Sequence, residues 1–231
     1  MVELPRVKSI LTALALSFVS AMAADDPAPD AREILRSVRI AQSSQEWNLR
    51  GQLRVSSKKY PFRLILDKGS IRYEFTDTND SITLRLTEKS SILEEKKGGK
   101  TAKVTPAKFD SPVRDTDISY EDLALRFLYW NDAKVVGSDI IVAHKCWKVE
   151  VRPPSGESQY SRVMLWVGKD DGALMKAESF DAKGNWVRRF TVRSVMKRDG
   201  FWLLKQMRIE RSTGRTEDLR PTYLEIDDVE K

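Results

Sequence analysis

From Trp47 onward, apolar and polar residues of this chain alternate with a period of two. The stretch "NLRGQLRV" (48–55) places its leucines and valine on one side and its arginines on the other, and "PFRLILD", "SIRYEFT" and "SITLRLT" repeat the pattern. Successive side chains of a β-strand point to opposite faces of a sheet, so each stretch is predicted to be a strand with one buried and one wet face. Such strands are typical of antiparallel sheets.

The second half of the chain repeats this pattern. Predicted strands lie in "KCWKVEVR", "YSRVMLWV", "ALMKAESFD", "WVRRFTVRSV", "FWLLKQMRIE" and "TYLEIDD", and short turns rich in Gly, Asp and Asn separate them. No strand–helix–strand rhythm occurs, which excludes a parallel sheet. We therefore predict a mainly β (α+β) fold, a strongly curved antiparallel sheet or incomplete β-barrel of about 10–11 strands with two covering helices.

The first predicted helix lies in "DAREILRSVRIAQS", where Asp30 is in position to cap the N-terminus. Ile34, Leu35, Val38 and Ala41 recur at helical spacing and form one apolar stripe. This stripe predicts a helix over residues 31–43 that packs on the sheet.

The second predicted helix is "SYEDLALRFLYW" (119–130), with Ser119 as its cap. Three of its aromatic side chains and one leucine fall on roughly one face: Tyr120, Leu123, Phe127 and Trp130. A helix of about three turns that carries acids is poorly suited to lie on a membrane surface. We expect it to cover the open side of the curved sheet as a plug or lid.

The first residues have the form of an export signal. A short basic region is followed by an apolar run from Ile10 to Val19 and by Ala21-Met22-Ala23, a small-residue cleavage pattern. The run is shorter than the roughly 20 residues of a membrane-spanning helix. We predict a signal peptide over 1–23, a linker over 24–30 and a single domain over 31–231, located in the periplasm. Ala24 follows the predicted cleavage site, so the cysteine required for lipid attachment is absent there.

Composition narrows the classes of function. Cys146 is the only cysteine, so no internal disulfide can form and the domain depends on its core. The net charge of +6 would suit nucleic acid or anionic headgroups, but basic and acidic residues are interleaved along the chain. We expect a solvated mixed surface, no nucleic-acid partner and a monomeric protein.

The sequence offers little material for catalysis. His144 is the only histidine, and although Cys146 shares its strand face, neighbours of this kind are usually structural. Neither a phosphate-binding glycine loop nor a nucleophile elbow occurs. Asp170-Asp171 and Asp227-Asp228 are adjacent pairs that would point to opposite sides of an extended chain. We therefore predict a protein that is not an enzyme and uses no metal or cofactor.

Large or adaptable side chains gather on the strands of the second half: Trp147, Met164, Trp166, Phe180, Phe190, Trp202 and Met207. In the simpler interpretation they fill a core, because a sheet must bury one face. In the other they line a cavity for a long apolar ligand, since curved sheets of this strand number can enclose space and methionine adapts to varied shapes. The residues alone leave both possibilities open.

The segments "TDISYEDL" (116–123), "YSRVMLWVGKDDGALMKAESFDAKGNWVRRFTV" and "RDGFWLLKQMRIE" together resemble the outer-membrane lipoprotein-sorting protein family, relatives of the periplasmic Lol carrier. The resemblance extends over roughly residues 31–229. It implies an incomplete β-barrel closed by helices, whose apolar inner face holds lipoprotein acyl chains. It also implies an inner-membrane transporter and an outer-membrane acceptor as partners.

Taken with the residues, this resemblance predicts a periplasmic carrier that binds acyl chains of lipoproteins, or another lipid, and shuttles them toward the outer membrane. The alternative is a sensor, scaffold or exporter-accessory protein of the same fold that binds a protein partner. The predicted acyl-chain-binding residues are Leu64, Leu66, Tyr73, Phe75, Trp147, Met164, Trp166, Phe180, Phe190 and Met207. The predicted lid helix contributes Tyr120, Leu123, Phe127 and Trp130, and together with the helix at 31–43 it is expected to cover the cavity mouth.

Overall fold

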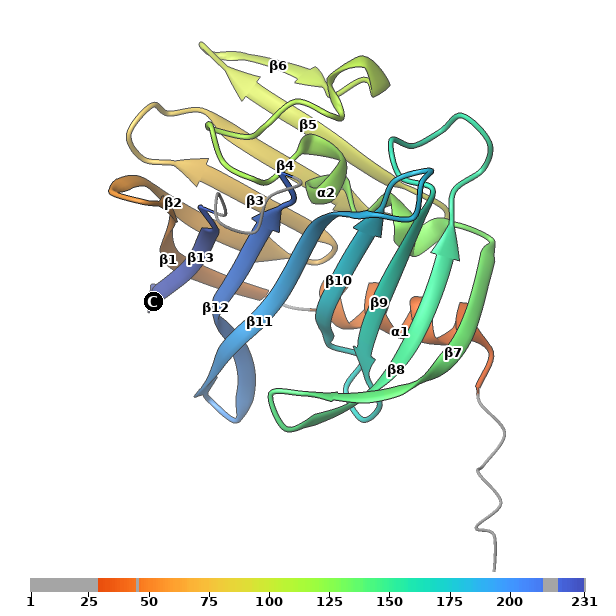
Figure 1. Ribbon diagram of the computed structural model, residues 1–231. Helices are drawn as coiled ribbons and strands as arrows, with labels where there is room; N and C mark the ends of the chain where they lie inside the picture. The colour runs from red at the N-terminus through yellow and green to blue at the C-terminus, as the bar shows by residue number, and fades with distance from the viewer. Residues whose placement is uncertain (1–28, 45, 214–219, 231) are drawn as a thin grey trace, which may run out of the picture.

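The computed structural model describes residues 29–44, 46–213 and 220–230, and within them the chain forms one curved antiparallel sheet (Figure 1). The predicted signal peptide and most of the predicted linker lie outside the described residues. Among the residues that are described, no helix combines the length and apolarity that crossing a bilayer requires.

Six strands belong to the first half of the chain: β1 (Glu46–Val55), β2 (Lys58–Asp67), β3 (Ser70–Phe75), β4 (Ser81–Leu86), β5 (Ser91–Lys97) and β6 (Lys100–Lys103). Seven belong to the second half: β7 (Asp132–Ile141), β8 (His144–Arg152), β9 (Arg162–Gly168), β10 (Leu174–Phe180), β11 (Trp186–Arg198), β12 (Phe201–Arg211) and β13 (Thr222–Glu230). The mainly β class is confirmed. The sheet has 13 strands rather than 10–11, because β6 is only four residues long and the exposed β7 has no clean alternation that would define it.

The strand order is β6-β5-β4-β3-β2-β1-β13-β12-β11-β10-β9-β8-β7. The last strand therefore joins the two halves of the sheet through antiparallel pairing with β1 and β12. The pairing of β1 with β13 is interrupted by a register shift at Gly51, where a Cβ atom would lie 2.2 Å from the carbonyl oxygen of Glu225. Only glycine fits this close approach of two backbones.

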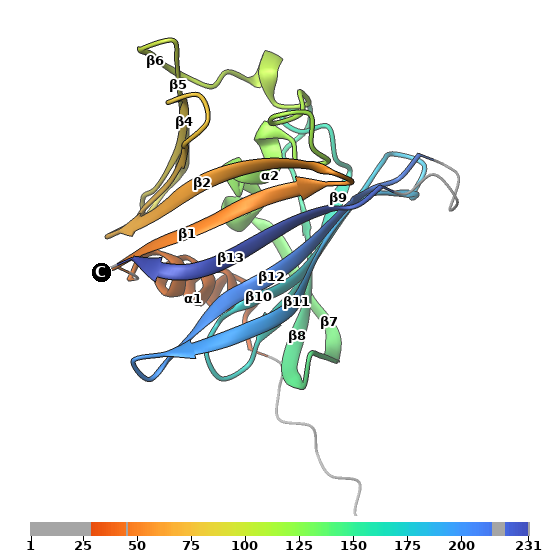
Figure 2. The same cartoon turned by 90° about the vertical axis from the view of Figure 1, so that its left-hand side faces the viewer.

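Helix α1 (Ala31–Ser43) crosses one face of the second-half strands (Figures 1 and 2). Its predicted cap is confirmed, since the Asp30 carboxylate accepts a hydrogen bond from the Arg32 amide at 2.9 Å. Ile34, Leu35 and Val38 are buried and pack against residues of β8, such as Val149, of β9 and of the segment 126–129. The helical stripe thus buries the middle of the second half of the sheet.

The predicted helix over 119–130 is interrupted. The capping box between Ser119 and Asp122 is present, but α2 (Tyr120–Ala124) ends after five residues. Leu125 then adopts the left-handed conformation (φ 48°), and the 3₁₀ helix η2 (Arg126–Tyr129) follows. A left-handed residue ends an α-helix by turning the backbone away from its axis. We call residues 119–130 the covering segment. A second short 3₁₀ helix, η1 (Pro106–Lys108), precedes it in the chain.

Candidate functional site: an apolar cavity inside the half-barrel

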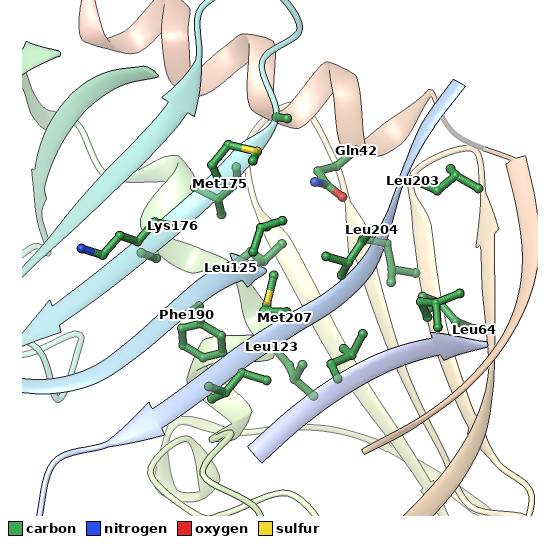
Figure 3. Close-up of a pocket in the computed structure, with 18 of the residues that line it drawn as sticks. Gln42, Leu64, Leu123, Leu125, Met175, Lys176, Phe190, Leu203, Leu204 and Met207 are labelled. Carbon is green, nitrogen blue, oxygen red and sulfur yellow. The ribbon is translucent and has the colours of Figure 1, made fainter. Parts of the chain in front are cut away.

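A cavity of about 270 Å³ lies between the sheet and the segments that cover it (Figure 3). The side chains labelled in the close-up reach it from different parts of the chain: Leu64 from β2, Phe190 from β11, Leu203, Leu204 and Met207 from β12, and Leu123 and Leu125 from the covering segment. Further aliphatic walls come from the central strands, with Leu49, Ile209, Leu224 and Ile226. The cavity is therefore built by tertiary contacts between both halves of the sheet.

Few polar residues contribute to the cavity lining: Gln42, Tyr73, Asp122, His144, Asp171 and Lys176, and the ammonium group of Lys176 lies over the Trp166 ring instead of in the cavity. Burial raises the pKa of the Tyr73 phenol to about 12, so this group is neutral at physiological pH. Within the described residues, no group of three or more His, Cys, Asp and Glu side chains is placed to hold a metal ion. This lining suits an apolar ligand better than a charged one.

Five of the ten residues predicted to bind acyl chains line the cavity: Leu64, Leu66, Tyr73, Phe190 and Met207. They lie on β2, β3, β11 and β12, and a period of two is enough to place them on the inner face of their strands. Whether they contact a lipid stays a prediction.

Met164, Trp166 and Phe180 lie on the other face of the sheet. In the strand register Leu165 stands between Val149 and Ala177, which pack with α1, whereas Trp166 stands between Lys148 and Lys176. Cross-strand partners share a face, so Trp166 points away from α1. The ammonium groups of both lysines lie over its ring, and Arg162 lies 3.9 Å from the Phe180 ring centroid.

The sequence interpretation was wrong about these three side chains because β9 is buried on both faces. On such a strand, hydrophobicity does not distinguish the inner face from the outer one. Trp147 is on the α1 side, but the Lys169 ammonium covers its ring at 3.6 Å and it does not line the cavity. Phe75 lies in the core beneath the guanidinium of Arg114 and does not line it either.

Of the four predicted lid residues in the covering segment, two line the cavity and two do not. Leu123 and Phe127 line the cavity, as does Leu125, which the helical spacing did not select. The Tyr120 hydroxyl instead bonds to Glu95, and Trp130 packs edge-to-face on Phe127 within the core. The break at Leu125 changes which side chains point inward, so a straight helical face describes only part of this segment.

Sequence reasoning also missed several residues of the cavity wall. Leu203 and Leu204 are consecutive, as are Leu174 and Met175, yet all four line the cavity. Register shifts in β10 and β11 near these positions explain why neighbours reach the same space. A period-two pattern has no signal for such irregularities. Gln42, at the end of α1, was also outside the predicted stripe.

A buried polar cluster fastens the covering segment to the sheet. The Asp122 carboxylate accepts hydrogen bonds from the Ser119 amide at 2.8 Å and the Tyr160 hydroxyl at 2.7 Å, and it pairs with Arg188 of β11 at 3.4 Å. Burial raises the pKa of Asp122, although Arg188 and the hydrogen-bond donors oppose the rise. The Arg188 guanidinium also donates to the Asp117 carbonyl at 2.6 Å. We call Asp122, Tyr160 and Arg188 the anchor cluster.

Several solved structures share the fold of this chain. A DUF1329 family protein from Desulfovibrio piger is similar at a TM-score of 0.65 with 19% identity, over 88% of this chain and 92% of that one. A candidate outer membrane lipoprotein-sorting protein domain from Vibrio parahaemolyticus is similar at a TM-score of 0.67 with 14% identity, over 87% and 91%. A LolA superfamily protein from Nitrosomonas europaea is similar at 0.61 with 14% identity, over 88% and 94%.

These structural similarities confirm the fold that the sequence resemblance implied, the curved half-barrel of lipoprotein-sorting proteins. No curated protein matches the sequence. A family model whose description reads "-like: Uncharacterized protein" matches residues 96–230, which is more than half of the chain, and the chain therefore belongs to that family.

Proposed function

We propose that this protein is a periplasmic carrier that binds the acyl chains of lipoproteins, or of another lipid, in its half-barrel cavity and shuttles them toward the outer membrane. Its partners would be the lipid cargo, a membrane protein that supplies it and an acceptor that receives it. The similar structures named for lipoprotein sorting support this proposal at the level of the fold.

The observation that carries the proposal is the apolar cavity itself. Its walls come from the concave face of the sheet and from the covering segment, and its volume of about 270 Å³ is near the lower end of ligand pockets, which span roughly 300–1,000 Å³. Such a space takes part of a long acyl chain without rearrangement. Because each buried methylene contributes about 0.8 kcal/mol, partial burial also keeps binding reversible, as a carrier requires.

The proposed periplasmic location rests on the signal peptide predicted for the first residues of the chain. The predicted signal peptide over 1–23 and the linker over 24–30 precede a single domain over 31–231, and a cleaved leader would release that domain into the periplasm. In this proposal the protein acts without catalysis, metal or cofactor.

Native mass spectrometry of the protein purified gently from periplasm, combined with lipid extraction of the same sample, tests the proposal. We expect an additional lipid-sized mass that is lost on denaturation. A protein mass without any lipid would contradict the carrier role and would favour the alternative, a sensor or scaffold whose partner is another protein.

A substitution in the cavity wall makes the test specific. Met207 lines the cavity and is only partly buried, so Met207→Glu should leave the sheet folded while placing a charge where the acyl chain would lie. We expect lipid occupancy to fall by about tenfold or more. Met207→Leu, which nearly conserves volume, is the matched control and should retain lipid. Equal lipid occupancy in both variants would show that the lipid binds elsewhere.

A further inference from the structure

Two hairpin turns carry large apolar side chains into solvent. At the β7–β8 turn Ile140 is 65% exposed and Val142 is 44% exposed, and at the β11–β12 turn Phe201 is 63% exposed and Trp202 is 58% exposed. Exposed side chains of this size that gather on one region mark interaction sites in soluble proteins. We call these four residues the apolar tips.

The apolar tips lie at one end of the molecule, together with the β9–β10 turn. Figures 1 and 2 both show these three turns at the bottom of the view. The cavity lining reaches the surface at this end among other places, since Trp202, His144 and Asp171 are exposed or partly exposed lining residues that lie in or beside these turns. The anchor cluster lies next to α2, where the lining residues Leu123 and Leu125 are also partly exposed. The apolar tips therefore lie beside one opening of the cavity, which we call its mouth, and Trp202 belongs to both.

Positive charge accompanies the apolar tips. The outer part of the β11–β12 hairpin, residues 193–205, carries Arg193, Lys197, Arg198 and Lys205 against a single acid, Asp199. All four basic side chains are exposed, and within the described part of the chain none of them forms an ion pair. Lys197 lies 5.8 Å from the Trp202 ring centroid. An exposed tryptophan beside unpaired bases is the arrangement that favours the headgroup region of an anionic bilayer.

We propose that this end of the protein docks on the surface of an anionic phospholipid bilayer, with the apolar tips in the headgroup region and the β11–β12 bases against lipid phosphates. Apolar side chains on two separate projecting turns suit insertion into the headgroup region of a bilayer better than a flat contact with a folded protein. The orientation rests on the proposed carrier function: the cavity mouth would face the bilayer, so an acyl chain would pass between them without crossing water.

The β7–β8 turn contributes no net charge to this surface. Asp139 accepts hydrogen bonds from the Trp166 indole at 3.0 Å and from the Ile140 amide, and Lys145 is the nearby base. Electrostatic attraction is therefore assigned to the β11–β12 hairpin, whereas both hairpins supply apolar contact. We therefore expect substitutions of the basic residues and substitutions of the apolar tips to differ in how they change the salt dependence of vesicle binding.

Sedimentation with sucrose-loaded vesicles tests the proposal, using the protein purified from periplasm without detergent. Vesicles of phosphatidylethanolamine and phosphatidylglycerol are compared with vesicles of phosphatidylcholine alone. We expect binding to the anionic vesicles that weakens as salt is raised. Ile140→Ser/Phe201→Ser, neither of which lines the cavity, should weaken binding by roughly tenfold or more. Val136→Ser, an apolar residue 43% exposed elsewhere on β7, is the matched control and should bind normally.

A charge variant provides a second measurement that is independent of the apolar substitutions. Lys197→Gln/Arg198→Gln should weaken binding by about fivefold per residue and reduce its salt dependence. Lys100→Gln/Lys103→Gln on the exposed strand β6 removes the same charge away from the mouth and should have little effect. Circular dichroism and thermal unfolding establish that each variant is folded.

The outcomes separate this inference from the proposed function. The docking surface would be overturned if the wild-type protein did not bind anionic vesicles, or if the tip and charge variants bound them as well as the wild type. This holds even if lipid is retained in the cavity. The docking surface would also be overturned if light scattering showed a dimer and the four tip residues were buried between its two copies. Vesicle binding by a protein that carries no lipid would leave the docking surface standing and remove the carrier role.

Discussion

Glu225 lies where three central strands meet, and its environment is set by cross-strand neighbours. Its carboxylate accepts hydrogen bonds from Arg54 at 2.7 Å, from Gln52 at 2.9 Å and from Gln206 at 3.1 Å, so β1, β12 and β13 share one polar contact. The Arg54 hydrogen bond holds the pKa of Glu225 below its ordinary value, and the two amides add to this, although burial opposes it.

Glu225→Gln should lower the free energy of unfolding by about 1 kcal/mol at pH 7, because the contact with Arg54 is partly solvated. The folded-state pKa is depressed, so this contribution is present above the unfolded pKa of about 4.3 and is lost as pH falls through the folded value. Urea unfolding at pH 7 and pH 3 measures the difference between variant and wild type. Asp227→Asn, an exposed carboxylate on the same strand, serves as the control, and a pH-independent difference at Glu225 would contradict the linkage.

At the scale of elements, the covering segment depends on its attachment to the sheet. α2 has five residues, which is too short for an independently stable helix. Its position is determined instead by the Asp122–Arg188 pair, whose side chains are 2% and 3% exposed, and by the Tyr160 hydroxyl. These contacts therefore attach the segment to β11 as one wall of the cavity, and its movement as a lid stays a prediction.

Arg188→Met should destabilise the protein by about 3–5 kcal/mol, because it leaves the buried Asp122 carboxylate without its cation. Adding Asp122→Asn should recover part of that loss, since the amide carries no charge. Hydrogen exchange of residues 117–130 should increase more than exchange of the central strands. Arg189→Met is the matched control: its side chain is 31% exposed and pairs with Glu178, so a loss of about 1 kcal/mol or less is expected. Equal effects at both arginines would contradict the anchor role.

At the scale of the whole molecule, β13 joins the sheet through pairings distant in sequence. Leu224 stands between Leu53 of β1 and Met207 of β12, and it is 5% exposed. Neither half of the sheet therefore completes its core without the last strand. Folding that depends on such non-local pairing is slow compared with folding of helical proteins.

We expect residues 31–231 to unfold in one cooperative transition, with calorimetric and van't Hoff enthalpies that agree. Leu224→Ala should shift the whole transition by about 2–5 kcal/mol without splitting it. Tyr223→Ala, on the other face of β13, should cost less because its ring is partly exposed. Two separate transitions would instead mean that the halves are independent domains.

The alternation of residues was enough to predict the antiparallel sheet and most of its turns. Helical spacing and capping residues predicted the first helix with its Asp30 cap and the capping box at Ser119. These features depend on local geometry, in which each side chain's direction follows from its position along a strand or helix. The same local rule correctly placed Leu64, Leu66, Tyr73, Phe190 and Met207 on the inner face.

Tertiary structure alone decided which apolar residues line the cavity. Met164 and Trp166 point away from α1 although they are as hydrophobic as the inner residues, because an apolar cluster buries both and two lysines from neighbouring strands cover the Trp166 ring. Leu125 and Leu203 point inward because a left-handed residue and strand register shifts change the local period. The sequence by itself determined the sheet, since alternation is a local property. The cavity depended on the folded structure, since burial on either face is set by elements far away in the chain.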